Sequence, residues 1–111
     1  MTLSQRQAIF AHNVSTLIQY INLNNHTCTF GEAYRTPEQA AIYAQSGKGI
    51  VDSLHCKRLA IDLNIFHNNI YLTDSKDYEI FGIFWESLSP SNKWGGRWTK
   101  LKDGNHFQMD E

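Results

Sequence analysis

The sequence has little of several features that mark specialised classes of protein. It holds two cysteines in 111 residues, which is too few for the disulfide framework of a small secreted domain. We therefore expect Cys28 and Cys56 to be free thiols. No apolar run approaches the ~20 residues that cross a bilayer, and the first residues lack the basic and apolar segments of a signal peptide. These absences predict synthesis in the cytoplasm and no stable membrane association.

The chain also lacks a strong excess of either charge. Ten basic and eleven acidic side chains give a formal net charge of −1. Modules that bind nucleic acid usually carry a basic excess, because phosphate contacts supply most of their affinity. We expect no nucleic-acid partner, since a solvated surface run explains Lys93, Arg97, Lys100 and Lys102 at least as well as a binding patch does.

The length and the pattern of apolar residues predict one domain, residues 1–111, which we expect to be a monomer. Behind a Ser4 and Gln7 capping box, helical spacing predicts a helix over residues 5–23. The other expected elements are strands at 27–34, 59–66, 70–72 and 106–109, and helices at 37–45 and about 75–88. No regular βαβ rhythm is present, so we expect an α+β fold in which a mostly antiparallel sheet packs with about three helices.

A carboxylate interrupts the most apolar predicted strand. Asp62 lies in the middle of residues 59–66, which should be buried, and burying an unpaired charge is very costly. An arginine or backbone N–H groups would satisfy it, and for Asp62 alone that interpretation is favoured over a metal. His55 changes the balance, because it lies seven residues earlier, where a turn would bring both side chains to one ion. A distant His106 would then complete a layout common in catalytic zinc sites.

Asp103 precedes His106 by three residues across a Gly-Asn turn. A carboxylate in this position can lie beside a metal without binding it, and can accept a proton from the attacking water. A turn-forming role is the alternative, because Asp-Gly is common in turns. Cys56 is a weaker rival for the metal, because neighbours on an extended chain point apart.

Together these residues resemble a zinc peptidase family that includes D-alanyl-D-alanine carboxypeptidases and dipeptidases and the L-alanyl-D-glutamate endopeptidases of phage endolysins. The family pattern S-x-H-x-x-G-x-A-x-D is met at Ser53, His55, Ala60 and Asp62, and the later E/D-x-x-H at Asp103 and His106. The resemblance covers residues 30–108, most of the chain. One departure is Arg58, which stands where the family has glycine and predicts a differently shaped lip of the cleft.

The resemblance implies a role for each residue. His55, Asp62 and His106 would bind zinc, and Asp103 would act as general base. Arg35 would contact the scissile carbonyl or its developing oxyanion. Ser53 and Trp94 would support the site or line its wall.

The expected function is therefore the hydrolysis of peptidoglycan stem peptides by a phage or prophage L-alanyl-D-glutamate endopeptidase. Such an endolysin would be made in the host cytoplasm and would act on the wall in the periplasm during host lysis. The short chain, which is close to a bare catalytic domain, and the missing export signal favour this over a D-alanyl-D-alanine carboxypeptidase or dipeptidase. A non-enzymatic zinc-stabilised binding module is a third alternative. A structural zinc site, however, needs neither a base such as Asp103 nor an oxyanion partner such as Arg35.

Overall fold

The computed structural model describes residues 1–49, 53–99 and 102–111. Along the chain its elements are α1 Leu3–Leu23, β1 His26–Phe30, α2 Pro37–Gln45, the 3-10 helix η1 Leu54–Lys57, β2 Ala60–His67, β3 Ile70–Tyr71, the 3-10 helix η2 Ser75–Tyr78, α3 Glu79–Ser87, β4 Asn92–Trp94, the 3-10 helix η3 Gly95–Arg97 and β5 His106–Met109. The described residues thus form an α+β fold with three α-helices and an antiparallel sheet, which confirms the predicted fold class.

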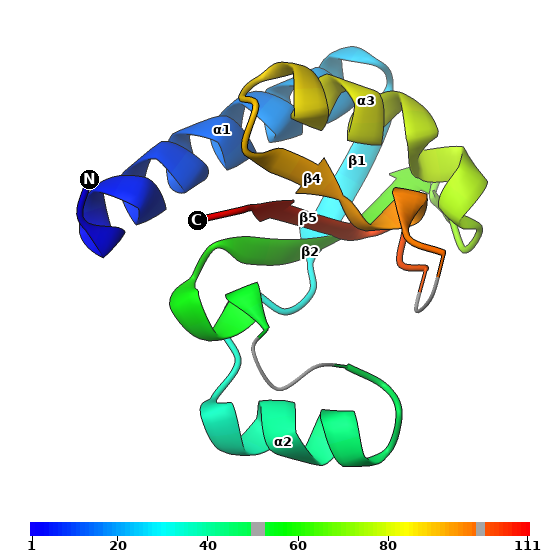
Figure 1. The fold of residues 1–111 in the computed structure, drawn as a ribbon. Helices are drawn as coiled ribbons and strands as arrows, with labels where there is room; N and C mark the ends of the chain where they lie inside the picture. Colours follow the sequence, from blue (N-terminus) through cyan, green and yellow to red (C-terminus); the bar gives the residue numbers. More distant parts are fainter. Residues whose placement is uncertain (50–52, 100–101) are drawn as a thin grey trace.

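The sheet has the strand order β1-β2-β5-β4, and β3 pairs with β2 as the second arm of a hairpin. The hairpin turn is formed by Asn68 and Asn69, which both have positive φ angles, as a two-residue hairpin turn of this kind requires. Helices α1 and α3 cover one face of the sheet, whereas α2 lies on the opposite side (Figure 1). The strands β2 and β5 therefore separate a helical layer from the segment that carries α2 and η1.

The core lies between the sheet and the pair α1 and α3. From Ile61 onward the burial of strand β2 alternates, so that Ile61, Leu63 and Ile65 are buried on the helical side. Their apolar partners include fully buried side chains of α1 and α3, namely Leu17, Ile21, Phe81 and Trp85. Because β2 buries this face against helices, its other face is free to carry Asp62.

Three sequence predictions need correction at element boundaries. The capping box is formed by Thr2 and Gln5 and not by Ser4 and Gln7, because the Thr2 hydroxyl accepts from the Gln5 N–H and the Gln5 side chain accepts from the Thr2 N–H. Strand β1 ends at Phe30, before the predicted residue 34, because Asp62 then bonds to two residues: its carbonyl accepts from the Gly31 N–H and its N–H donates to the Glu32 carbonyl, which breaks the one-to-one register. The third predicted helix starts as the 3-10 turn η2.

The expectation of two free thiols is confirmed. Cys28 and Cys56 are both free. Within the described ranges, no helix is long and apolar enough to span a membrane.

Candidate metal centre

His55 is held by a short 3-10 turn that precedes β2. Ser53 caps this turn, because its hydroxyl accepts from the His55 N–H at 3.2 Å. The turn ends at Arg58, whose left-handed backbone (φ 56°) redirects the chain into the strand. The imidazole of His55 is buried at 1% exposure. His55, which precedes β2, therefore points back over that strand toward Asp62, as the seven-residue spacing between them predicted.

Asp62 and His106 are brought together by strand pairing. They are directly opposed in the antiparallel register of β2 and β5, and directly opposed residues share one face of a sheet. That face is the one turned away from the buried side chains of β2. The predicted contact between distant parts of the chain therefore follows from backbone register alone.

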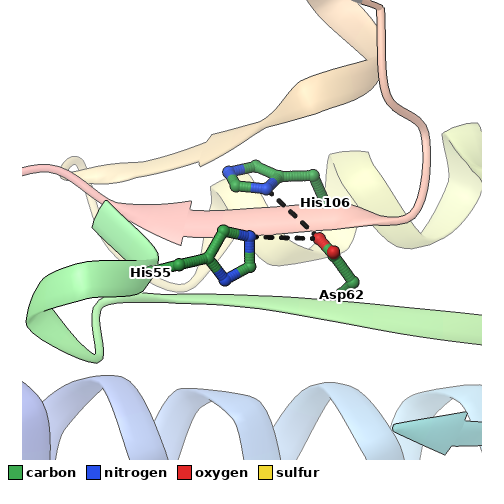
Figure 2. A group of neighbouring side chains, drawn as sticks. All are labelled: His55, Asp62 and His106. Carbon is green, nitrogen blue, oxygen red and sulfur yellow. Dashed lines mark ion pairs between the residues drawn. The ribbon is translucent and has the colours of Figure 1, made fainter. Parts of the chain in front are cut away.

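The three side chains converge on one point (Figure 2). The Asp62 Oδ1 atom lies 3.4 Å from His55 Nε2 and 3.3 Å from His106 Nδ1. One ligand atom from each residue lies within 4.8 Å of the other two. The His55 and His106 rings are nearly perpendicular, with centroids 4.9 Å apart. Two imidazoles and one carboxylate form a donor set typical of catalytic zinc.

The polar atoms of the group are under-satisfied in a way that suits a metal. Asp62 Oδ1 and His55 Nδ1 are buried without a hydrogen-bond partner, and buried polar groups are normally paired. Burial alone would raise the pKa of Asp62, but the neighbouring imidazoles of His106 and His55 outweigh it and hold the pKa at about 2. The carboxylate is therefore ionised and ready to bind a cation.

Glu32 is a carboxylate that no sequence pattern singled out. Its Oε1 atom lies 3.8 Å from His55 Nδ1, the ring nitrogen that faces away from Asp62. The same oxygen lies 2.5 Å from both Nε and Nη2 of Arg35. Glu32 therefore links the candidate ligand to the candidate oxyanion partner, and carboxylates behind metal-binding histidines orient such rings.

Arg35 lies in the segment between β1 and α2, as predicted. Besides the Glu32 contact, Nη1 donates to the Ser53 hydroxyl at 3.3 Å, and the guanidinium lies 4.8 Å from the centroid of the Tyr43 ring. Its backbone N–H donates to the His55 carbonyl at 3.2 Å. The arginine is thereby fixed beside the His55 turn, and the structure brings Arg35, Ser53 and His55 together.

Asp103 lies on a turn that is anchored from several sides. Its N–H donates to the Gly95 carbonyl, and its own carbonyl accepts from the His106 N–H. A Cβ at Gly95 would lie 2.4 Å from the Asp103 carbonyl oxygen, so this close approach needs glycine. Burial, followed by the negative charge of Asp62, raises the pKa of Asp103. A carboxylate with a raised pKa is a better proton acceptor than an ordinary one.

Two tryptophans contact this region in different ways. Trp94 is 4% exposed, and its Nε1 donates to the Gly104 carbonyl at 2.7 Å, so it supports the Asp103 turn from inside the core. Trp98 was not selected from the sequence, yet its ring lies 4.8 Å from the His106 ring. Only its place in an aromatic loop near the predicted ligands hinted at this contact.

A buried group of two histidines and one aspartate, accompanied by the Asp103 carboxylate and the Arg35 guanidinium, is typical of a metal-dependent peptidase. A family model described as D-alanyl-D-alanine carboxypeptidase matches residues 46–109, more than half of the chain. The chain therefore belongs to this family. The match includes His55, Asp62, Asp103 and His106 but not Arg35.

The comparison with solved structures finds the same fold in two peptidases. One is the L-Ala D-Glu endopeptidase ChiX of Serratia marcescens, with a TM-score of 0.63 and 22% identity over 75% of this chain and 66% of that one. The other is a mutant of the vancomycin-resistance D,D-pentapeptidase VanY from a VanB-type cassette, in complex with Zn(II), with a TM-score of 0.62 and 15% identity over 92% of this chain and 71% of that one. This chain thus spans just under two thirds of the length of ChiX. No curated protein matches the sequence.

The family match confirms the family that the sequence predicted, and the two solved structures share its fold. The His-Asp-His group offers the ligands that the predicted zinc ion needs, and the VanY structure is itself a complex with Zn(II).

Proposed function

We propose that this chain is a zinc peptidase that hydrolyses the stem peptides of peptidoglycan between L-alanine and D-glutamate. The convergence of His55, Asp62 and His106 carries the proposal, because each ligand atom lies within 4.8 Å of the others and two buried atoms of the group lack partners. Family membership supports the peptidase class, and the fold shared with ChiX supports the substrate.

His55 Nε2, Asp62 Oδ1 and His106 Nδ1 would hold the zinc ion. When bound, zinc supplies Lewis-acid polarisation of the scissile carbonyl. The Asp103 carboxylate accepts a proton as water attacks the carbonyl carbon, and it returns that proton to the leaving nitrogen as the C–N bond breaks. Its raised pKa makes it a better proton acceptor in the first of these transfers.

Arg35 is suited to a carbonyl oxygen more than to a free carboxylate. Its charge is already balanced by Glu32, and the N–H groups of the fork that Glu32 and Ser53 leave unused can donate to a developing oxyanion. A carboxypeptidase must bind the terminal carboxylate of its substrate, for which an unpaired cation is better suited. This balance favours the endopeptidase over a D-alanyl-D-alanine carboxypeptidase or dipeptidase, the second candidate and the activity that names the family model.

Cutting within the crosslinked mesh is the activity that lysis requires. We therefore extend the proposal to a phage or prophage endolysin. It would be a monomeric single domain, made in the host cytoplasm and acting on the wall in the periplasm. A non-enzymatic zinc module is disfavoured because a structural site normally has four protein ligands and no base beside them.

The test is digestion of purified sacculi with the zinc-loaded protein, followed by mass analysis of the new ends. New D-glutamate amino termini with loss of turbidity are expected. Release of free D-alanine from intact sacculi would establish the carboxypeptidase instead. His106→Ala, measured by metal analysis, should bind much less zinc; full retention of zinc by this variant would overturn the ligand assignment.

A further inference from the structure

A row of polar side chains extends from His106 along β5. His106 Nε2 lies 2.8 Å from Gln108 Oε1, and Gln108 Nε2 donates to Asp110 Oδ1 at 2.7 Å. Residues two apart on a strand lie on the same face, so the sequence His-x-Gln-x-Asp places all three in line. This row lies on the side of the imidazole that faces away from Asp62, which contacts Nδ1.

Donor and acceptor chemistry fixes the direction of every hydrogen bond in the row. The Asp110 carboxylate accepts from Gln108 Nε2 and does not donate. The amide of Gln108 must therefore turn its NH₂ group toward Asp110 and its oxygen toward His106. An amide oxygen only accepts, so His106 must carry its proton on Nε2. The lone pair is thereby left on Nδ1, the atom that faces Asp62.

The backbone of Gln108 is itself rigidly held. Its carbonyl accepts from Trp85 Nε1 at 2.9 Å, and Trp85 is fully buried. The backbone N–H of Asp110 donates to the Ser91 carbonyl at 2.8 Å. The row is therefore attached to the packed core and not to a loop, as the positioning of a ligand requires.

We propose that Gln108 and Asp110 are positioning residues that select the metal-binding tautomer of His106. Asp110 orients the Gln108 amide, and the amide keeps the imidazole proton on Nε2, so that Nδ1 is available to the ion before the ion arrives. The inference rests on the metal site of the proposed function and is independent of which peptide bond is cleaved. Partners behind metal ligands of this kind typically change metal affinity by ~10–100-fold when removed.

The first test is made on Gln108→Met, which keeps the length of the side chain and removes both hydrogen bonds. After chelation of the metal, imidazole ¹⁵N shifts are recorded across a pH series, and the tautomer is assigned from the spectra of the neutral ring. The wild-type His106 should be protonated on Nε2, and the variant should lose this preference. Its zinc dissociation constant, measured by chelator competition, should rise by ~10–100-fold.

Gln108→Glu is the conservative variant. A carboxylate can only accept from His106 Nε2, so this change should retain the Nε2–H tautomer, although it repels Asp110. Asp110→Asn tests the far end: the new amide can donate to Gln108, which can then turn its NH₂ group toward His106. This variant should lose part of the tautomer preference, and it provides a second measurement if Gln108→Met folds poorly.

Gln45→Met on the exposed end of α2 is the matched control and should change neither readout. An Nε2–H tautomer and an unchanged zinc affinity in Gln108→Met would overturn the proposal. A wild-type protein that shows the tautomer but binds no zinc would instead overturn the metal site. Because neither readout involves peptidoglycan, failure of the proposed peptidase activity is detected separately.

Discussion

The two sides of the sheet differ in how much of their sequence is packed. On one side, α1 and α3 bury large side chains against β2, including Leu17, Phe81 and Trp85. On the other side, Ala40 is the one buried residue of α2, and Ile42 of the same helix is 57% exposed. The helices α1 and α3 therefore provide most of the apolar burial that stabilises the fold. Helix α2, on the opposite side of the sheet (Figure 1), buries little apolar surface.

The candidate metal centre lies where these two sides meet. Asp62 and His106 belong to the sheet, whereas His55 and Arg35 come from the α2 side. The two sides are joined through hydrogen bonds, including that from the Asp62 N–H to the Glu32 carbonyl at 2.9 Å, and not through a large apolar interface. We therefore expect that some substitutions lower turnover without changing the free energy of unfolding, and that others do the reverse.

Asp103→Asn should lower turnover most strongly while leaving the free energy of unfolding unchanged. The amide keeps the shape of the carboxylate and the turn, but it cannot accept the proton. We expect a ~10²–10⁴-fold fall in kcat, with the free energy of unfolding and the zinc content unchanged. Steady-state kinetics on a stem-peptide substrate, with exposed Asp77→Asn as control, gives the answer. Near-normal turnover would make Asp103 a turn residue only.

Trp85→Ala should have the opposite profile. This fully buried ring also donates from Nε1 to the carbonyls of Lys93 and Gln108. Removing a buried tryptophan costs ~3–5 kcal/mol of unfolding free energy, measured by denaturant titration of the zinc-free protein. Exposed Ile42→Ala on α2 is the control and should cost less than ~0.5 kcal/mol. Equal costs at the two positions would contradict the comparison between the sides.

Arg35→Lys probes the junction itself. The ammonium keeps the charge but loses the planar fork that contacts Glu32 and Ser53. We expect a fall in kcat on the order of 10²-fold, the size expected when an oxyanion donor is lost. The free energy of unfolding should fall by less than ~1 kcal/mol, since ion pairs outside the core contribute little. Unchanged turnover would place Arg35 outside the transition-state contacts.

Tyr78→Phe tests the helical side with a smaller change. The hydroxyl accepts from the Ile65 N–H and donates to the Leu72 carbonyl, so its loss should cost ~1–2 kcal/mol. Burial raises the pKa of Tyr78 from 10.0 to about 12. The folded state thus favours the neutral phenol, and this stabilisation is complete below the ordinary pKa and lost as pH rises through the raised one. Denaturant titrations should show the wild-type advantage shrinking across that alkaline range; an advantage independent of pH would contradict this.

The sequence alone was enough to identify the site residues that interrupt a regular pattern. Asp62 was visible because a carboxylate broke an apolar strand, and His106 because a histidine followed a turn by a fixed spacing. Glu32 gave no such signal, since an acidic residue in a polar segment is ordinary and only the folded chain places it between His55 and Arg35. The role of Gly95 was equally invisible, because it depends on a close backbone approach from residue 103.

Arg58 shows where a sequence departure leaves the backbone unchanged. The family glycine predicted a special conformation at this position, and Arg58 adopts the left-handed conformation (φ 56°) that glycine accepts without strain. Its guanidinium lies 4.1 Å from the centroid of the Tyr34 ring. The turn that positions His55 is therefore formed with arginine in place of glycine, and the Arg58 side chain packs over the Tyr34 ring.

Arg58→Gly should consequently have the smallest effect of the series. Glycine removes the left-handed strain of ~1 kcal/mol but loses the cation–π contact, worth ~0.5–1 kcal/mol at an exposed site, and gains entropy in the unfolded chain. These contributions nearly cancel, so we expect the free energy of unfolding to change by less than ~0.5 kcal/mol. Arg58→Ala loses the contact without relieving the strain and should be the less stable of the two. Denaturant titration of both variants measures the difference. If Arg58→Gly were less stable than Arg58→Ala, the left-handed backbone at residue 58 would not be the source of strain.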